Sequence, residues 1–132
     1  MYSYISGELR FKQAGIAIVE NCGIGYKIHT TEQAVASLEL GTKITLYTYL
    51  YVREDDLSLY GFLNYEDVAL FAILLGVSGI GPRVSLSICS FGGAATVYGA
   101  IVSKDIVWLT KVPGVGKKTA ERLVLELREK IV

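Results

Sequence analysis

A short segment that could bind phosphate occurs twice in this chain, thirty-five residues apart. The first copy runs from Val77 to Arg83 (Val-Ser-Gly-Ile-Gly-Pro-Arg) and the second from Val112 to Lys118 (Val-Pro-Gly-Val-Gly-Lys-Lys). Each copy precedes an apolar helical pattern, so free backbone N–H groups, the helix dipole and a positive charge meet at a helix start. The repeat predicts a tandem grip on a repeating anion, and a nucleic-acid backbone is the first candidate.

The glycines and cations of the repeat have distinct expected roles. The glycines permit a tight turn and let a phosphate approach the backbone, because no Cβ stands in the way. Arg83 and Lys118 both lie four residues after the first glycine of their copy, and Lys117 adds a cation to the later copy only. The alternative, that Gly-x-Gly merely caps a helix corner, is disfavoured by two copies in register. The predicted DNA-contacting residues are Gly79, Gly81, Arg83, Gly114, Gly116, Lys117 and Lys118.

Two enzymatic interpretations of the repeat fail. A nucleotide-binding P-loop needs glycine at position 111 and Ser or Thr at 118, but lysine stands at both. A base-excision glycosylase would need a catalytic carboxylate downstream in a helical domain, and the sequence ends at Val132. Cys22 and Cys89 are isolated, which indicates reduced core residues and no metal site. We expect no catalytic residue, no metal and no cofactor.

An acidic cluster and a tyrosine stripe each leave two interpretations open. Glu54-Asp55-Asp56 reads first as a solvated turn between strands, although carboxylates on a phosphate-binding protein could also repel a backbone and part strands. A stripe of Tyr47, Tyr49 and Tyr51 could stack on bases or pack on a neighbouring element or subunit. His29 has no acidic or nucleophilic neighbour in the pattern, so we interpret it as structural.

The first half of the chain has the alternation of β-strands. Strands are expected over residues 2–9, 16–20, 24–28, 43–52 and 57–62, with a helix over 31–40 that ends at Gly41. Five short strands with a helix after the third is the order of an OB-fold barrel.

Near Asn64 the hydrophobic period changes from about 2 to about 3.6. Helices are expected over residues 68–75, 82–89, 94–102, 104–110 and 118–131, with each Gly-x-Gly turn between two of them. The sequence thus predicts an α+β chain of two domains: a five-stranded OB-fold barrel (residues 1–63) and an all-α tandem of helix-hairpin-helix units (residues 64–132).

Composition limits how such a protein could bind nucleic acid. Hydrophobic residues make up 52% of the chain and charged residues 20%, which excludes a disordered tail. The net charge is zero; residues 1–64 hold five Lys or Arg against seven Asp or Glu, and residues 65–132 hold eight against six. Binding must therefore depend on placed contacts. We expect a cytoplasmic protein, since no signal peptide is evident and the apolar run from Val68 to Val77 is too short to span a membrane.

With these segments together, the sequence resembles RuvA, the family of Holliday-junction-binding subunits of the bacterial branch-migration complex. The run from Pro113 to Leu123 is the most specific part, since Gly-x-Gly alone is not diagnostic. The other matching segments are Ile5-Ser6-Gly7, Val52-Arg53-Glu54-Asp55, Leu59-Tyr60-Gly61-Phe62 and Gly79-Ile80-Gly81-Pro82-Arg83.

The resemblance implies a non-catalytic, structure-specific DNA-binding subunit. One or two tetramers of the family hold a four-way junction open, and the hairpins grip the duplex arms through phosphates on the minor-groove side. The family's central acidic pin falls on Glu54 and Asp55, which favours the strand-parting interpretation of that turn; the role of Asp56 stays unassigned. The implied partners are four-way-junction DNA, further copies of the chain, the RuvB motor ATPase and the RuvC resolvase. A general single-strand or duplex binder is the alternative.

The family also carries a flexible linker and a third helical domain that binds RuvB. Here the sequence stops within or just after the helix expected over residues 118–131. We therefore expect the motor-binding domain to be missing, while junction binding and assembly persist.

Overall fold

A computed structural model of the chain describes residues 2–131 and divides the chain into two compact units. We call Met1–Val68 the barrel unit and Ala69–Val132 the helical unit. The division falls inside α2 (Tyr65–Leu75), later than the boundary expected after residue 63. Each unit is described by itself.

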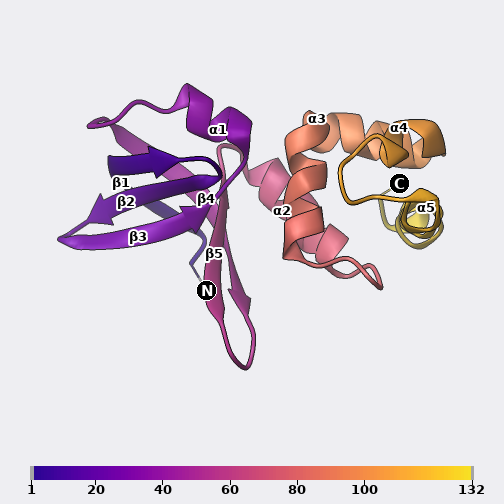
Figure 1. The fold of residues 1–132 in the computed structure, drawn as a ribbon, viewed down its shortest axis with the longest axis horizontal. Helices are drawn as coiled ribbons and strands as arrows, with labels where there is room; N and C mark the ends of the chain where they lie inside the picture. The colour runs from indigo at the N-terminus through magenta and orange to yellow at the C-terminus, as the bar shows by residue number, and fades with distance from the viewer. Residues whose placement is uncertain (1, 132) are drawn as a thin grey trace. The chain divides into compact units, whose positions relative to one another are not determined.

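The barrel unit is a closed five-stranded barrel with the strand order β1-β2-β3-β5-β4 (Figure 1). Neighbouring strands are antiparallel except β3 and β5, which pair in parallel through Ile28 and His29. This confirms the predicted barrel, with one helix after the third strand. Its elements are β1 (Tyr4–Gln13), β2 (Ile16–Asn21), β3 (Ile24–His29), α1 (Glu32–Ser37), β4 (Lys43–Val52) and β5 (Leu57–Phe62).

Strand β1 continues to Gln13, four residues beyond its expected end, because it pairs with two different strands. Its first half pairs with β4, and from Glu8 onward it pairs with β2. The register shifts at a bulge between Leu9 and Phe11, and such a bulge bends a strand so that a barrel can close. At Gly7 the strands approach so closely that a Cβ would lie 2.2 Å from the Glu20 carbonyl oxygen. Glycine is therefore required there by packing.

Helix α1 is shorter than the helix expected over residues 31–40. Thr31 caps its start by accepting a hydrogen bond from the Ala34 N–H at 3.1 Å. Leu38 then leaves the helix in an extended conformation and is buried in the barrel core. The Lys12 ammonium donates to the carbonyls of Val35 and Leu38, so β1 satisfies acceptors at the helix end that a longer helix would have used. Tertiary contacts thus end this helix before Gly41.

The two faces of β4 follow the predicted alternation. Leu46 and Thr48 are buried inside, whereas the tyrosines of the stripe are half-buried on the other face. Tyr47 lies 6.3 Å from Tyr4 and 6.4 Å from Tyr65 between ring centroids. Tyr51 meets Tyr60 edge-on at 6.3 Å. These two tyrosines therefore pack on rings of their own unit.

The helical unit contains the predicted tandem, namely α2, α3 (Pro82–Val102), α4 (Ile106–Thr110) and α5 (Lys117–Ile131). Helix α3 consists of two helical segments that meet at a kink at Gly93, where φ is +69°, and these segments correspond to the two helices expected over residues 82–89 and 94–102. Asp105 caps α4 by accepting from the Trp108 N–H at 3.0 Å. The fully buried side chains include Leu70, Phe71, Leu74, Ile88, Ile101, Leu109, Leu123 and Leu127.

Helix α3 is long and apolar enough to cross a membrane by length and composition alone. This is weak evidence, because the core helix of a soluble protein passes the same test. Here α3 contributes buried residues to the unit, Ile88 and Ile101 among them, and packs against α5.

Candidate nucleic-acid interface

The two Gly-x-Gly turns have the same backbone geometry. In the first, the Ile80 N–H donates to the Val77 carbonyl at 3.1 Å; in the second, Val115 donates to Val112 at 3.0 Å. All four of these apolar side chains are buried and anchor the turns in the core. The two turns are thus structural equivalents, as the thirty-five-residue repeat predicts.

The two glycines of each turn differ in backbone conformation and in the space around them. The first glycines, Gly79 and Gly114, have φ of +86° and +90°, a conformation that other residues adopt only with strain. The second glycines, Gly81 and Gly116, do not have positive φ, and a Cβ on either would meet nothing within 4 Å. Neither backbone strain nor packing requires glycine at 81 and 116. Glycine at these two positions leaves the start of the following helix without a side chain.

Gly81 and Gly116 immediately precede α3 and α5. The Gly81 carbonyl accepts from the Ser85 N–H at 3.0 Å, and the Gly116 carbonyl accepts from the Ala120 N–H at 2.9 Å. The N–H groups of the first helical turn have no partner within a helix, so they can donate to an anion outside it. Pro82 removes one such donor from α3, whereas the corresponding Lys117 keeps it in α5.

The charges at these two helix starts are the opposite of what helix stability favours. Carboxylates stabilise a helix N-terminus and cations do not. The first turns of α3 and α5 carry no acidic residue, whereas Arg83 lies in the first turn of α3 and Lys117 and Lys118 in that of α5. All three cations are exposed, and among residues 2–131 no ion pair joins them to a carboxylate. The arrangement therefore suits an external anion.

The predicted acidic residues lie in the turn between β4 and β5, which we call the acidic turn (residues 53–56). The hairpin that carries it projects beyond the rest of the barrel (Figure 1). The Arg53 N–H donates to the Asp56 carbonyl at 2.8 Å and closes the turn. Glu54 and Asp55 are exposed, and Arg53 Nε lies 3.9 Å from Asp55 Oδ1. The turn thus presents carboxylates to solvent at the end of a projecting hairpin.

Asp56 differs from its two neighbours because its side chain is tied to the hairpin. The Ser58 hydroxyl donates to Asp56 Oδ2 at 2.8 Å. This hydrogen bond, helped by the Leu57 backbone N–H, lowers the pKa of Asp56 below its usual value. Asp56 therefore has a local structural role, which the sequence left unassigned.

His29 is half-buried and stacks on Tyr60, with 5.2 Å between the ring centroids. Burial lowers its pKa, the charge of Lys27 lowers it further, and Asp56 opposes the shift. His29 and Asp56 share the lining of a hollow of about 460 Å³ beside the acidic turn. The stacking agrees with a structural role for this histidine.

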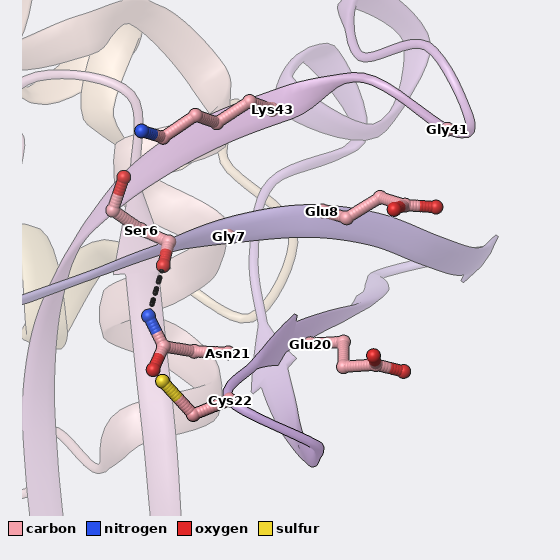
Figure 2. A pocket seen from close by; sticks show the side chains of 8 residues that line it. All are labelled: Ser6, Gly7, Glu8, Glu20, Asn21, Cys22, Gly41 and Lys43. Atoms are coloured by element: carbon pink, nitrogen blue, oxygen red, sulfur yellow. Dashed lines mark hydrogen bonds between the residues drawn. The ribbon is translucent and has the colours of Figure 1, made fainter.

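A second hollow of about 460 Å³ lies on the barrel around Gly7, outside the predicted site (Figure 2). Asn21 Nδ2 donates to the Ser6 carbonyl at 2.6 Å and closes one side. The exposed Cys22 stands beside Asn21, so the expectation that both cysteines are core residues is wrong; only Cys89 is buried. Glu8 and Glu20 each lie within 4 Å of Arg10. Among the described residues, no three His, Cys, Asp or Glu side chains gather as a metal site.

Two family models match the chain. The description "RuvA N terminal domain" matches residues 1–61, and "SAM-like Helix-hairpin-helix tandem" matches residues 71–129. The second match covers both Gly-x-Gly turns. A protein of Alkaliphilus oremlandii named Holliday junction branch migration complex subunit RuvA is 47% identical over 99% of this chain and 68% of its own length. The chain belongs to the RuvA family.

Other RuvA proteins give the same result. The protein of the same name from Acetivibrio thermocellus is 43% identical over 99% of this chain and 65% of its own length. That from Mycobacterium leprae is 42% identical over 96% of this chain and 63% of its own length. The chain thus spans about two thirds of the length of these RuvA relatives.

Proposed function

We propose that this chain is the DNA-binding part of a non-catalytic subunit that recognises four-way DNA junctions by shape and phosphate contacts, with little base readout. The observation that carries the proposal is the pair of equivalent helix starts with glycine and a cation where stability would favour carboxylates. Such contacts position a backbone but carry no sequence information. The printed names of the RuvA relatives support a Holliday junction as the DNA.

In this proposal the two charged features have opposite tasks. The hairpins attract the backbone of each arm through the backbone N–H groups near Gly81 and Gly116 and through Arg83, Lys117 and Lys118. The acidic turn repels phosphates at the crossover and guides strands into separate arms, with Glu54 and Asp55 exposed at the end of its hairpin. A single chain supplies one acidic turn, whereas a junction has four arms, so we propose that the chain works as a tetramer or as two tetramers on DNA.

The proposed partners follow from the resemblance to RuvA, and the relatives' names, which describe a subunit of a branch migration complex, support a larger assembly. Branch migration needs a motor, and neither glycine-rich turn here fits a nucleotide-binding P-loop. We propose that an ATP-driven partner, RuvB, moves the junction and binds through a part of the relatives that this chain does not span. RuvC would then act on the same junction.

A competition gel-shift assay tests the junction preference. A labelled four-way junction bound by the chain is competed with unlabelled junction, linear duplex or single strand of equal length at one salt concentration. Junction should compete at least tenfold better than either linear DNA. Equal competition by linear duplex or single strand would replace the proposal with a general DNA-binding module.

A further inference from the structure

The two hairpin repeats contact each other reciprocally. The Ser87 hydroxyl in α3 donates to the Pro113 carbonyl of the second turn at 3.0 Å. Arg122 Nη1 in α5 donates to the Ser78 carbonyl of the first turn at 3.2 Å. Ser87 and Arg122 are equivalent positions of the thirty-five-residue repeat, and so are Ser78 and Pro113. The same position of each repeat thus donates to the same turn position of the other repeat. Such a reciprocal contact is typical of two units related by a two-fold axis.

The same arrangement closes the side of each turn that faces the other repeat. A Cβ on Gly79 would lie 3.3 Å from Arg122 Nη1, and a Cβ on Gly114 would lie 3.5 Å from Val84 Cγ2. The first glycine of each turn is therefore covered by the second helix of the other repeat. The second glycine of each turn, Gly81 or Gly116, stays open.

We infer that Arg122 and Ser87 are positioning residues that hold the two phosphate-binding turns at one separation and orientation. This inference rests on the proposed function and deepens it. The antiparallel strands of a duplex are related by two-fold axes, so two turns with a two-fold relation can meet equivalent phosphates on opposite strands. Fixing the turns before binding removes the entropic cost of ordering them on the DNA.

Arg122 is an exposed cation on a DNA-binding unit, so a direct phosphate contact is the competing role. Its observed hydrogen bond goes to a backbone carbonyl, and a bond from a charged donor is stronger than one between neutral groups. The two roles differ in salt dependence. A lost phosphate contact lowers the slope of log K against log salt by about 0.9, whereas a loosened turn keeps all its phosphate contacts.

The test compares Arg122→Gln and Ser87→Ala with two reference variants: Arg128→Gln, which removes an exposed cation from the same helix, and Lys118→Gln, which removes a proposed phosphate contact. Dissociation constants for junction and linear duplex are measured between 50 and 200 mM salt, and amide hydrogen exchange is measured without DNA. Loss of one hydrogen bond by Arg122→Gln should weaken binding about fivefold with the salt slope unchanged. Exchange should accelerate at residues 79–81, although the substitution lies in α5. Ser87→Ala should do the same at residues 114–116, and Arg128→Gln should do neither.

Two outcomes overturn the inference. A salt slope that falls in Arg122→Gln as far as in Lys118→Gln would make Arg122 a phosphate contact. If Arg122→Gln and Ser87→Ala kept wild-type hydrogen exchange at both turns and wild-type DNA affinity, the two hydrogen bonds would have no positioning role. If the wild-type chain bound linear duplex as tightly as junction, the proposed function would fail. Exchange and duplex affinity would still test the positioning role on their own.

Discussion

At the scale of single residues, substitution of the second glycine of each turn best distinguishes an effect on DNA binding from an effect on stability. Gly81→Ala and Gly116→Ala should lower stability by no more than about 1 kcal/mol, because the new methyl groups meet no atom and no positive φ is required, and the remaining cost is that alanine is a poorer residue than glycine just before a helix. Each should weaken junction binding by about 1 kcal/mol, roughly fivefold, because in the proposed complex the methyl group would stand where a phosphate approaches. Fluorescence anisotropy with labelled junction and a thermal melt measure the two quantities.

Gly99→Ala is the matched control for these substitutions. Gly99 lies inside α3, and its added Cβ also meets nothing within 4 Å, but it belongs to neither turn. The control should bind like the wild type and be about 0.5–1 kcal/mol more stable through helix propensity. Unchanged binding in both hairpin variants would mean that phosphate does not approach these glycines.

His29 gives a residue-scale prediction about pH. Its pKa is lowered in the folded state, chiefly by burial, so the unfolded chain takes up a proton first as the pH falls. The free energy of unfolding should therefore be fully maintained above about pH 6.5 and decrease as the pH falls below that value. His29 is the only histidine in the sequence, so no other side chain has an ordinary pKa in this range.

Urea unfolding at pH 7.5, 6.5 and 5.5 checks this expectation. The midpoint should fall with pH in the wild type and change less in His29→Gln. An equal decrease in both proteins would assign the pH dependence to another group.

At the scale of elements, the acidic turn should affect the separation of DNA strands at the crossover without increasing junction affinity. Replacing both exposed carboxylates, Glu54→Gln with Asp55→Asn, should leave junction affinity equal or up to a few fold higher, because repulsion from phosphate is removed. Stability should change by less than about 0.5 kcal/mol, as usual for exposed positions. Chemical probing of unpaired bases at the crossover should show fewer opened pairs.

Glu39→Gln serves as the control for this double substitution, because it removes an exposed carboxylate elsewhere in the barrel unit. It should change neither affinity nor base opening. A clear loss of junction binding in the acidic-turn variant, with stability retained, would show that these carboxylates attract rather than repel the ligand.

The elements also differ in how well their bounds could be predicted. Strands β4 and β5 match their expected ranges, because strict alternation and a polar turn specify a hairpin locally. Strand β1 and helix α1 do not, since a bulge and a change of partner extend β1, and Lys12 and the burial of Leu38 shorten α1. Local pattern fails where a distant element supplies the hydrogen-bond partner.

At the scale of the whole molecule, we expect assembly and salt-dependent binding despite a net charge of zero. Light scattering should give four times the chain mass of 14.4 kDa, and four or eight chains per junction when DNA is added. Junction affinity should fall steeply between 50 and 200 mM salt, because placed cations release counterions whatever the overall charge. A chain that binds junction while remaining a monomer would contradict the proposed arrangement of four acidic turns.

By itself, the sequence determined the features whose causes are local. Positive φ at Gly79 and Gly114 and proline at the first position of α3 are properties of a few neighbouring residues, so the repeated turns could be predicted from spacing alone. The tertiary structure decided what depends on residues far apart in the chain. It distinguished the covered first glycines from the open second ones, and it brought Arg122 to Ser78 and Ser87 to Pro113. A periodic sequence can show that two turns are alike, but only packing can show that each is held by the helix of the other.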